Sequence, residues 1–135
     1  MISTKGRYAL RVLIDLSEQE PGARVPLRDV AERQDISEKY LQQIAKLLVG
    51  GGYLRGTSGK GGGYVLARRP EECVVADVLE LVEGTIAPVA CLAKDAEPCE
   101  RAATCKTLPM WRELYEKNLA YFGSITVADL GTQEI

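Results

Sequence analysis

The first fifty residues hold three stretches in which apolar positions recur with the period of an α-helix. In the first stretch a second apolar side accompanies the main one, so we expect a helix that is covered from two directions and acts as a central scaffold. Its apolar residues are Tyr8, Ala9, Leu10, Val12, Leu13, Ile14 and Leu16.

Two shorter helices are predicted next, with a tight break between them. Pro26 stands where a first helical turn tolerates proline, and the apolar residues after it span about two turns. Gln34 and Asp35 form the break, and Ser37 can cap the following helix. Two short helices joined by a tight turn predict a helix-turn-helix. The buried face of its second helix is expected to be Leu41, Ile44, Ala45 and Leu48.

The opposite side of this second helix carries long polar side chains. Glutamine can pair with adenine through two hydrogen bonds, and lysine reaches guanine edges or phosphate, so this side suits a DNA major groove. The solvated face of an ordinary amphipathic helix is the competing interpretation. The side chains that share this side are Lys39, Gln42, Gln43 and Lys46.

A β-hairpin with a basic, glycine-rich tip is predicted directly after the helix. Glycines 50–52 end the helix, and residues 53–55 and 64–66 are predicted as two short strands around the loop 56–63. A hairpin in this place is the wing of a winged helix. Its backbone amides and Lys60 can follow phosphates or the minor groove.

A nucleotide-binding P-loop is the competing interpretation of the Gly59-Lys60 pair. The first glycine of that motif would fall at Leu54, and this chain has Gly61 where Ser or Thr would follow the lysine. We therefore reject nucleotide binding at this hairpin.

Two further helices are predicted, with an irregular stretch between them. The first begins near Val74 and runs to Gly84, with Cys73 at its start as a buried small hydrophobe. The stretch 85–106 is rich in alanine, proline and acidic residues, and Pro109 stands in the first turn of the second helix. This helix carries an apolar stripe that we expect to pair with a second subunit, because the chain already has a core. The stripe consists of Trp111, Leu114, Tyr115, Leu119 and Phe122.

The formal net charge of −2 conceals an asymmetry between the two halves of the chain. Residues 1–69 hold 12 Lys and Arg against 7 Asp and Glu, a net charge of +5, whereas residues 70–135 hold 5 against 12, a net charge of −7. The basic half contains the predicted helix-turn-helix and hairpin, so it is the half expected to meet a polyanion. The opening segment lacks a signal-like or membrane-length apolar run, so we expect a soluble cytoplasmic protein with no membrane partner.

Three of the four cysteines, Cys91, Cys99 and Cys105, lie in the irregular stretch. In a reducing compartment such thiols serve metal ligation or redox sensing rather than disulfides. The stretch lacks the C-x2-C pair of a zinc knuckle, so a 2Fe-2S or 4Fe-4S iron–sulfur cluster is one interpretation and redox-active thiols are the other. The chain has no histidine, so another subunit, a small thiol, water or a carboxylate would supply the fourth ligand. The candidate carboxylates are Asp95, Glu97 and Glu100.

The absence of histidine also argues against an enzyme. Neither a Ser-His nor a Cys-His nucleophile can be built from this chain. An electron-transfer protein would carry a cluster without salt-dependent DNA affinity, and the predicted wing argues against that class.

Several segments together resemble the Rrf2 family of winged-helix transcription regulators. They are residues 3–10 (STKGRYAL), 36–44 (ISEKYLQQI), 61–66 (GGGYVL) and the cysteine stretch leading into Trp111. The resemblance covers nearly the whole chain. It implies a homodimer crossed by a long C-terminal helix, winged-helix domains that read a palindromic operator in double-stranded DNA, and DNA affinity controlled by the cluster.

The expected fold is mainly α with a small β-hairpin. We expect a winged helix-turn-helix domain at 1–84, a cluster-binding loop at 85–106, and a dimerisation helix with a C-terminal tail at 107–135. The expected cluster ligands are Cys91, Cys99 and Cys105. The expected DNA contacts are Ser37, Lys39, Tyr40, Gln42, Gln43, Lys46, Thr57, Ser58 and Lys60.

Two positions depart from the family pattern. Ser58 stands where the wing of many relatives carries arginine, and Leu108 stands where cluster regulators similar to IscR carry a ligand histidine. The leading hypothesis is a repressor that senses iron–sulfur status, redox state or nitric oxide. The alternative is a cluster-free, CymR-like regulator of cysteine or sulfur metabolism that acts through thiol oxidation or a partner protein.

Overall fold

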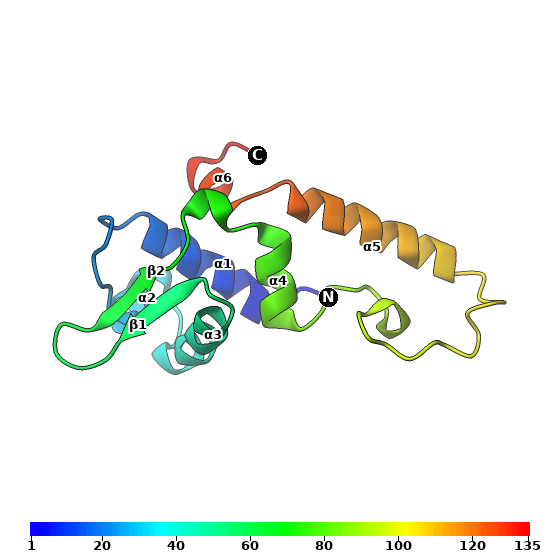
Figure 1. Cartoon of the computed structure of the whole chain (residues 1–135), viewed down its shortest axis with the longest axis horizontal. Coiled ribbons are helices and arrows are strands. Elements are labelled where there is room, and N and C mark those ends of the chain that lie inside the picture. Colours follow the sequence, from blue (N-terminus) through cyan, green and yellow to red (C-terminus); the bar gives the residue numbers. More distant parts are fainter.

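Six α-helices, two short 3-10 turns and one antiparallel hairpin make up the computed structural model, which describes residues 1–135 (Figure 1). The predicted fold class, mainly helical with a small hairpin, is confirmed. The α-helices are α1 (Thr4–Ser17), α2 (Leu27–Gln34), α3 (Glu38–Gly50), α4 (Val75–Glu83), α5 (Leu108–Gly123) and α6 (Val127–Thr132). The strands are β1 (Leu54–Thr57) and β2 (Gly63–Leu66), and the 3-10 turns are η1 (Pro70–Glu72) and η2 (Ala90–Leu92).

Helix α1 is the scaffold that the two-sided apolar pattern predicts. Ser3 caps it, with its side-chain oxygen accepting a hydrogen bond from the amide of Lys5 at 3.1 Å. Ala9, Val12 and Leu13 have no exposed surface, because the helix-turn-helix packs on one side of α1 and α4 packs on another. The other elements of the N-terminal part are therefore positioned by their contacts with α1.

The helix-turn-helix forms where the sequence predicts it. Helix α2 ends at Gln34, and the capping residue Asp35 adopts the left-handed backbone conformation with φ of 53°. The side chain of Ser37 accepts a hydrogen bond from the amide of Tyr40 at 3.2 Å and so caps α3. The predicted buried face of α3 is confirmed, since all four of its apolar side chains have no exposed surface.

The hairpin is tied to the segment that precedes α2. The amide of Val25 donates to the carbonyl of Tyr64 at 2.9 Å, and the amide of Tyr64 donates back to Val25 at 2.8 Å. Gly63 adopts φ of +152°, and a Cβ atom there would lie 2.6 Å from the carbonyl carbon of Val25, so only glycine fits this contact. Within the hairpin, the paired residues are Leu54 with Leu66, Arg55 with Val65, Gly56 with Tyr64, and Thr57 with Gly63.

Two groups of buried side chains hold the chain together. The larger core joins α1, α2, α3, the hairpin and α4, and it includes Cys73, which has no exposed surface. The predicted role of Cys73 as a small buried hydrophobe is therefore confirmed. A smaller core lies between α4 and α5 and consists of Val75 and Leu79 of α4 with Ile86 and Ile125 from the segments that follow the two helices.

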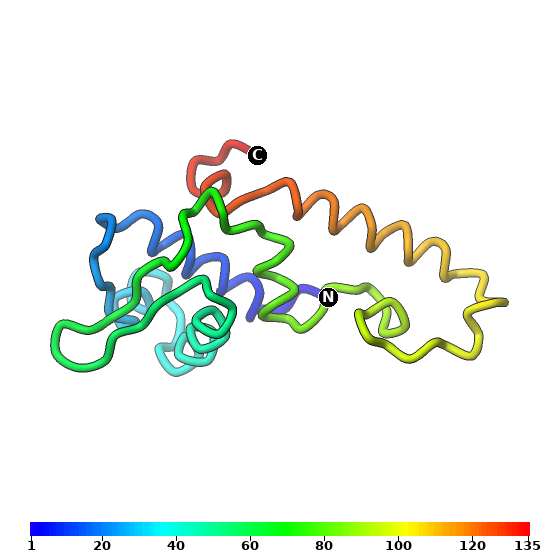
Figure 2. Tube along the Cα trace, in the orientation of Figure 1, coloured from blue at the N-terminus to red at the C-terminus, as the bar shows by residue number.

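Helix α5 extends away from the rest of the molecule (Figures 1 and 2). The segment between α4 and α5 runs out alongside it and turns back at its far end, where the trace is yellow in Figure 2. Apart from η2, this segment is irregular, as the sequence predicts. No helix, α5 included, combines the length and the apolar character needed to cross a membrane.

The last residues form a helix that the sequence reasoning described only as a tail. Thr126 accepts a hydrogen bond from the amide of Asp129 at 3.2 Å, and the Asp129 carboxylate accepts one from the amide of Thr126 at 2.9 Å. This capping box starts α6, and Val127 is buried in the larger core. The chain therefore returns to the N-terminal part after α5, and the T-x-x-D pattern was the signal that could have shown it.

Candidate nucleic-acid interface and cysteine loop

Helix α3 has one buried and one exposed side, divided as the helical pattern predicts. The four apolar side chains of its inner face have no exposed surface, whereas Lys39, Gln42, Gln43 and Lys46 are exposed. These two lysines form no ion pair, so their charges and the two amides are free to meet a ligand. This exposure is what a DNA-reading helix requires, and the DNA contacts themselves stay predictions.

Tyr40 differs from the other predicted contact residues because it is half-buried against α1. Its ring meets the ring of Tyr8 edge-on, with 5.7 Å between the centroids and 89° between the planes. Its hydroxyl lies 3.3 Å from the hydroxyl of Thr4. Tyr40 therefore joins the first turn of α3 to the first turns of α1.

The hairpin tip is fully exposed to solvent. Thr57, Ser58 and Lys60 are all exposed, and Lys60 has no carboxylate partner. Gly59 and Gly61 both have positive φ, and they shape the turn that carries Lys60. The tip thus presents a free ammonium group and exposed backbone to solvent.

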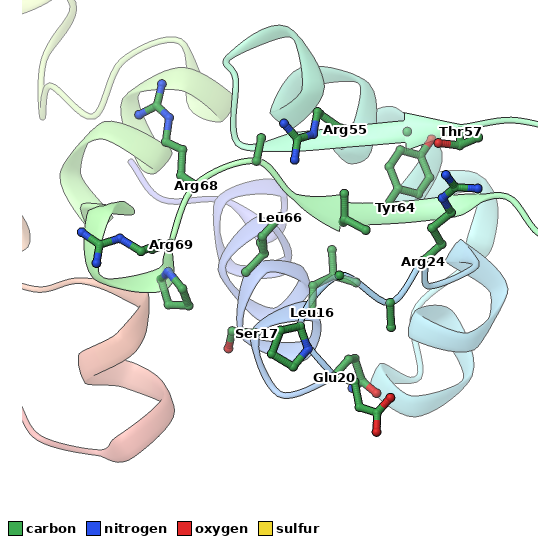
Figure 3. Close-up of a pocket in the computed structure, with 18 residues that line it drawn as sticks. Leu16, Ser17, Glu20, Arg24, Arg55, Thr57, Tyr64, Leu66, Arg68 and Arg69 are labelled. Carbon is green, nitrogen blue, oxygen red and sulfur yellow. The ribbon is translucent and has the colours of Figure 1, made fainter.

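A basic groove of about 710 Å³ lies beside the hairpin, between its strands and the segment that joins α1 to α2 (Figure 3). Arg24 and Arg55 line it and have no carboxylate partner. Arg68 also lines it but is fixed, because its guanidinium stacks 4.3 Å from the ring centre of Tyr53. Sequence reasoning did not single out Arg24 and Arg55, since only the folded chain shows that they share one side of the hairpin.

The three predicted metal ligands lie in the segment between α4 and α5, with Cys91 inside η2 and the other two after it. Cys91 and Cys99 are exposed, Cys105 is half-exposed, and none forms a disulfide. The thiols do not converge on one coordination sphere, and the structure contains no ready-made group of metal-binding side chains. The backbone hydrogen bonds of residues 89–106 close only local turns, so nothing in that pattern ties this stretch to the rest of the protein.

The chemistry of these thiols fits a thiolate-ligated cluster even though their positions do not preassemble one. Hydrogen bonds from the Thr107 hydroxyl and from the amides of Thr107 and Leu108 lower the pKa of Cys105, which favours the thiolate. Burial raises the pKa of Cys73 instead, which keeps that thiol protonated and inert. The stretch would have to close around a cluster for its three cysteines to bind it.

The predicted apolar stripe of α5 divides into two parts. Tyr115, Leu119 and Phe122 pack against the smaller core within the chain, and the Tyr115 hydroxyl donates to Glu80 at 2.9 Å. Leu114 is 41% exposed and stands apart from them. It belongs to a second, outward face of α5 with Met110 and Tyr121, which are 54% and 57% exposed.

Comparison with known proteins gives matches over nearly the whole chain. The family model Rrf2, described as an iron-dependent transcriptional regulator, matches residues 2–133. The regulator IscR of Xenorhabdus nematophila is 35% identical over 129 residues, which cover 96% of this chain and 77% of that protein. The structure of CymR, the global cysteine regulator of B. subtilis, matches with a TM-score of 0.77 and 31% identity over 98% of this chain and 97% of that one. T. potens IscR matches with a TM-score of 0.77 and 28% identity over 100% of this chain and 88% of that one.

Proposed function

Because this chain belongs to the Rrf2 family of transcriptional regulators, we propose that it is a repressor that binds a palindromic operator as a homodimer and responds to an iron–sulfur cluster. Family membership makes it a DNA-binding winged-helix regulator rather than an enzyme. We place its action in the cytoplasm, where thiols stay reduced. The observation that carries the DNA part of the proposal is the joint exposure of the polar face of α3 and of the hairpin tip with Lys60, in a hairpin whose first strand packs against α3.

The proposed DNA contacts divide into base readers and phosphate binders. Gln42 and Gln43 are the readers, because an exposed glutamine on a recognition helix can pair with a base edge through two hydrogen bonds. Lys60 binds phosphate or the minor groove from the hairpin tip. Arg24 and Arg55 extend this basic surface along the groove beside the hairpin, where their free guanidinium groups suit phosphate oxygens.

Selection from a random DNA library tests the DNA part. The wild-type protein is expected to enrich a palindrome whose half-sites lie about one helical turn apart, or a multiple of it. The matched variant has Gln42 and Gln43 both replaced by alanine, and it is expected to lose this enrichment. Both side chains are exposed, so their loss leaves the core intact. Failure of the wild-type protein to enrich any sequence, with and without a bound cluster, contradicts the proposal.

The proposed dimer uses the outward face of α5. Met110, Leu114 and Tyr121 expose apolar surface along one helix, and water is excluded from such surface when two copies pair. Leu114→Glu places a charge in that face and is expected to give a monomer at micromolar concentration in sedimentation. Glu113→Gln, a neighbouring exposed position, is the control and is expected to leave the dimer intact.

The proposed cluster is held by Cys91, Cys99 and Cys105. When bound, it supplies the redox and iron chemistry of the signal. The chain supplies three thiols, the hydrogen bonds that favour the Cys105 thiolate, and carboxylates of the same stretch that can complete the ligand set. Anaerobically purified protein is expected to contain iron and sulfide and to absorb visible light. Replacement of any one of these three cysteines by alanine is expected to abolish the absorbance, whereas Cys73→Ala is expected to keep it.

A cluster-free regulator is the alternative, and two observations favour it. The three thiols do not converge in this structure, and a CymR structure is among the similar ones. This alternative predicts operator binding without iron, together with reversible oxidation of the same cysteines. Iron and sulfide analysis of the anaerobic protein therefore separates the two proposals.

A further inference from the structure

Glu83 joins two segments that lie 80 residues apart in the chain. It is the last residue of α4, directly before the stretch that carries the three cysteines. Its carboxylate accepts hydrogen bonds from the amide of Ser3 at 2.7 Å, from the hydroxyl of Ser3 at 2.6 Å and from the amide of Gly6 at 3.0 Å. The end of α4 is thereby bound to the beginning of α1, which lies beside it in Figure 1.

The close approach at this point depends on Gly6. A Cβ atom at Gly6 would lie 3.0 Å from a methyl group of Leu79 and 3.3 Å from the Glu83 carboxylate. The carboxylate satisfies amides at the start of α1 that have no partner inside the helix, and its charge interacts favourably with the helix dipole. This contact accounts for the glycine in the TKGRYA segment of the sequence.

One face of α1 holds the beginning of the recognition helix. Thr4 and Tyr8 are one helical turn apart, and both contact Tyr40 in the first turn of α3. The start of α1 that Glu83 binds is therefore the part that meets Tyr40.

The same face of α1 holds the end of α2. Arg11 donates hydrogen bonds to the side chain of Gln34, at 3.1 Å, and to its carbonyl oxygen. One turn further, the buried carboxylate of Asp15 accepts hydrogen bonds from Arg33 and from Gln34. The face that runs along positions 4, 8, 11 and 15 thus fixes both sides of the helix-turn-helix turn.

We propose that Glu83 is a positioning residue that couples the cysteine stretch to the helix-turn-helix through α1. This inference rests on the proposed function, because it explains how a change at the cysteines reaches the DNA-binding helix. A change in residues 85–106 that displaces the last turn of α4 either carries the start of α1 with it or breaks the three hydrogen bonds of Glu83. Both outcomes alter the support of Tyr40, so the Glu83 contact, formed or broken, would carry the change to α3.

Amide hydrogen exchange on the full chain tests this inference without requiring DNA or a cluster. In Glu83→Ala, exchange is expected to rise at residues 3–8 and also at residues 34–43, about two- to thirtyfold, the range of coupling between linked sites. Glu83→Gln keeps one acceptor oxygen and is expected to give a smaller rise. Asp129→Ala is the matched control: it removes a carboxylate that caps another helix, α6, and is expected to leave residues 34–43 unchanged.

Two outcomes overturn the inference. One is faster exchange at residues 3–8 of Glu83→Ala with no change at residues 34–43, since Glu83 would then hold only α1. The other is an equal rise at residues 34–43 in Asp129→Ala, which would indicate general loosening.

Operator binding provides the second readout and separates this inference from the proposed function. If the wild-type protein binds the selected operator, Glu83→Ala is expected to bind it about two- to thirtyfold more weakly. Asp129→Ala is expected to bind it with the same affinity as the wild-type protein. Unchanged affinity in Glu83→Ala overturns the coupling and leaves the proposed function standing. Absence of operator binding by the wild-type protein overturns the proposed function, while the exchange data still decide whether Glu83 supports the turn.

Discussion

The guanidinium of Arg33 donates hydrogen bonds to both carboxylate oxygens of Asp15, at 2.7 and 3.0 Å. Gln34 adds a third hydrogen bond to the same carboxylate at 2.9 Å. Asp15 is the one charged residue that is buried, and these bonds compensate for its removal from water. The end of α2 is therefore bound to the last turn of α1 in one orientation.

Loss of this ion pair is expected to destabilise the fold. Arg33→Met leaves the Asp15 carboxylate, whose side chain is 3% exposed, with one remaining partner. The arginine side chain is 41% exposed, so we expect a loss of about 2 kcal/mol in the free energy of unfolding, below the range for fully buried pairs. Arg69→Met removes an exposed ion pair with Glu72 and serves as the control in the same denaturant titration, with no measurable change expected. Equal stability of the two variants would show that Asp15 does not depend on Arg33.

The contribution of Glu83 to stability is expected to depend on pH. Burial alone raises the pKa of this carboxyl, but the hydrogen bonds from Ser3 and Gly6 and the charge of Lys5 lower the pKa overall. As the pH falls, the unfolded chain takes up its proton first, so the stabilisation is present at neutral pH and is lost below the ordinary glutamate pKa of about 4.3. Unfolding of wild type and Glu83→Gln from pH 7 to pH 3 is expected to show a stability difference that shrinks in acid. A difference that grows in acid is the contrary result.

The four cysteines are expected to react at two different rates. Cys91, Cys99 and Cys105 reach solvent, whereas Cys73 is buried and the pKa of its thiol is raised by that burial. Brief alkylation of the native cluster-free protein should therefore add three labels by mass spectrometry, and the fourth only after unfolding. Rapid labelling of Cys73 in the native protein would show that the larger core opens at the start of α4.

Lys60 and Gln43 are expected to affect DNA binding differently. Lys60→Ala removes a phosphate-binding charge, so affinity should fall for all sequences. The slope of log affinity against log salt concentration should become shallower by about one. Gln43→Ala removes a base reader, so the preference for the selected operator over a mismatched one should fall by about 1–3 kcal/mol. Anisotropy titrations at several salt concentrations measure both quantities. A sequence-specific loss in Lys60→Ala would reverse the two roles.

The local features of this fold were predictable, because their causes are local. The helical period of the apolar residues predicts the buried face of α3, and the position of Ser37 predicts its N-terminal cap. The contacts of Asp15 and Glu83 could not be predicted from the sequence in the same way. In the sequence each is one acidic residue among 19, and only folding brings their partners Arg33 and Ser3 to them.

The candidate site was predictable to a similar degree. The exposed residues of α3 follow from its period, and the hairpin tip follows from its glycines. The groove with Arg24 and Arg55 required coordinates, since it joins a loop to a strand. The outward face of α5 was missed because tertiary packing divides the apolar stripe between the chain's own core and solvent.

The central claim is that α3 and the hairpin tip together hold a DNA duplex under the control of the cysteine stretch. Titration of the selected operator with anaerobic wild-type protein, before and after removal of iron, tests it most directly. The account predicts a complex whose affinity falls steeply with salt and differs between the two states. Absence of a complex in both states, or an affinity that is the same before and after removal of iron, would contradict this claim.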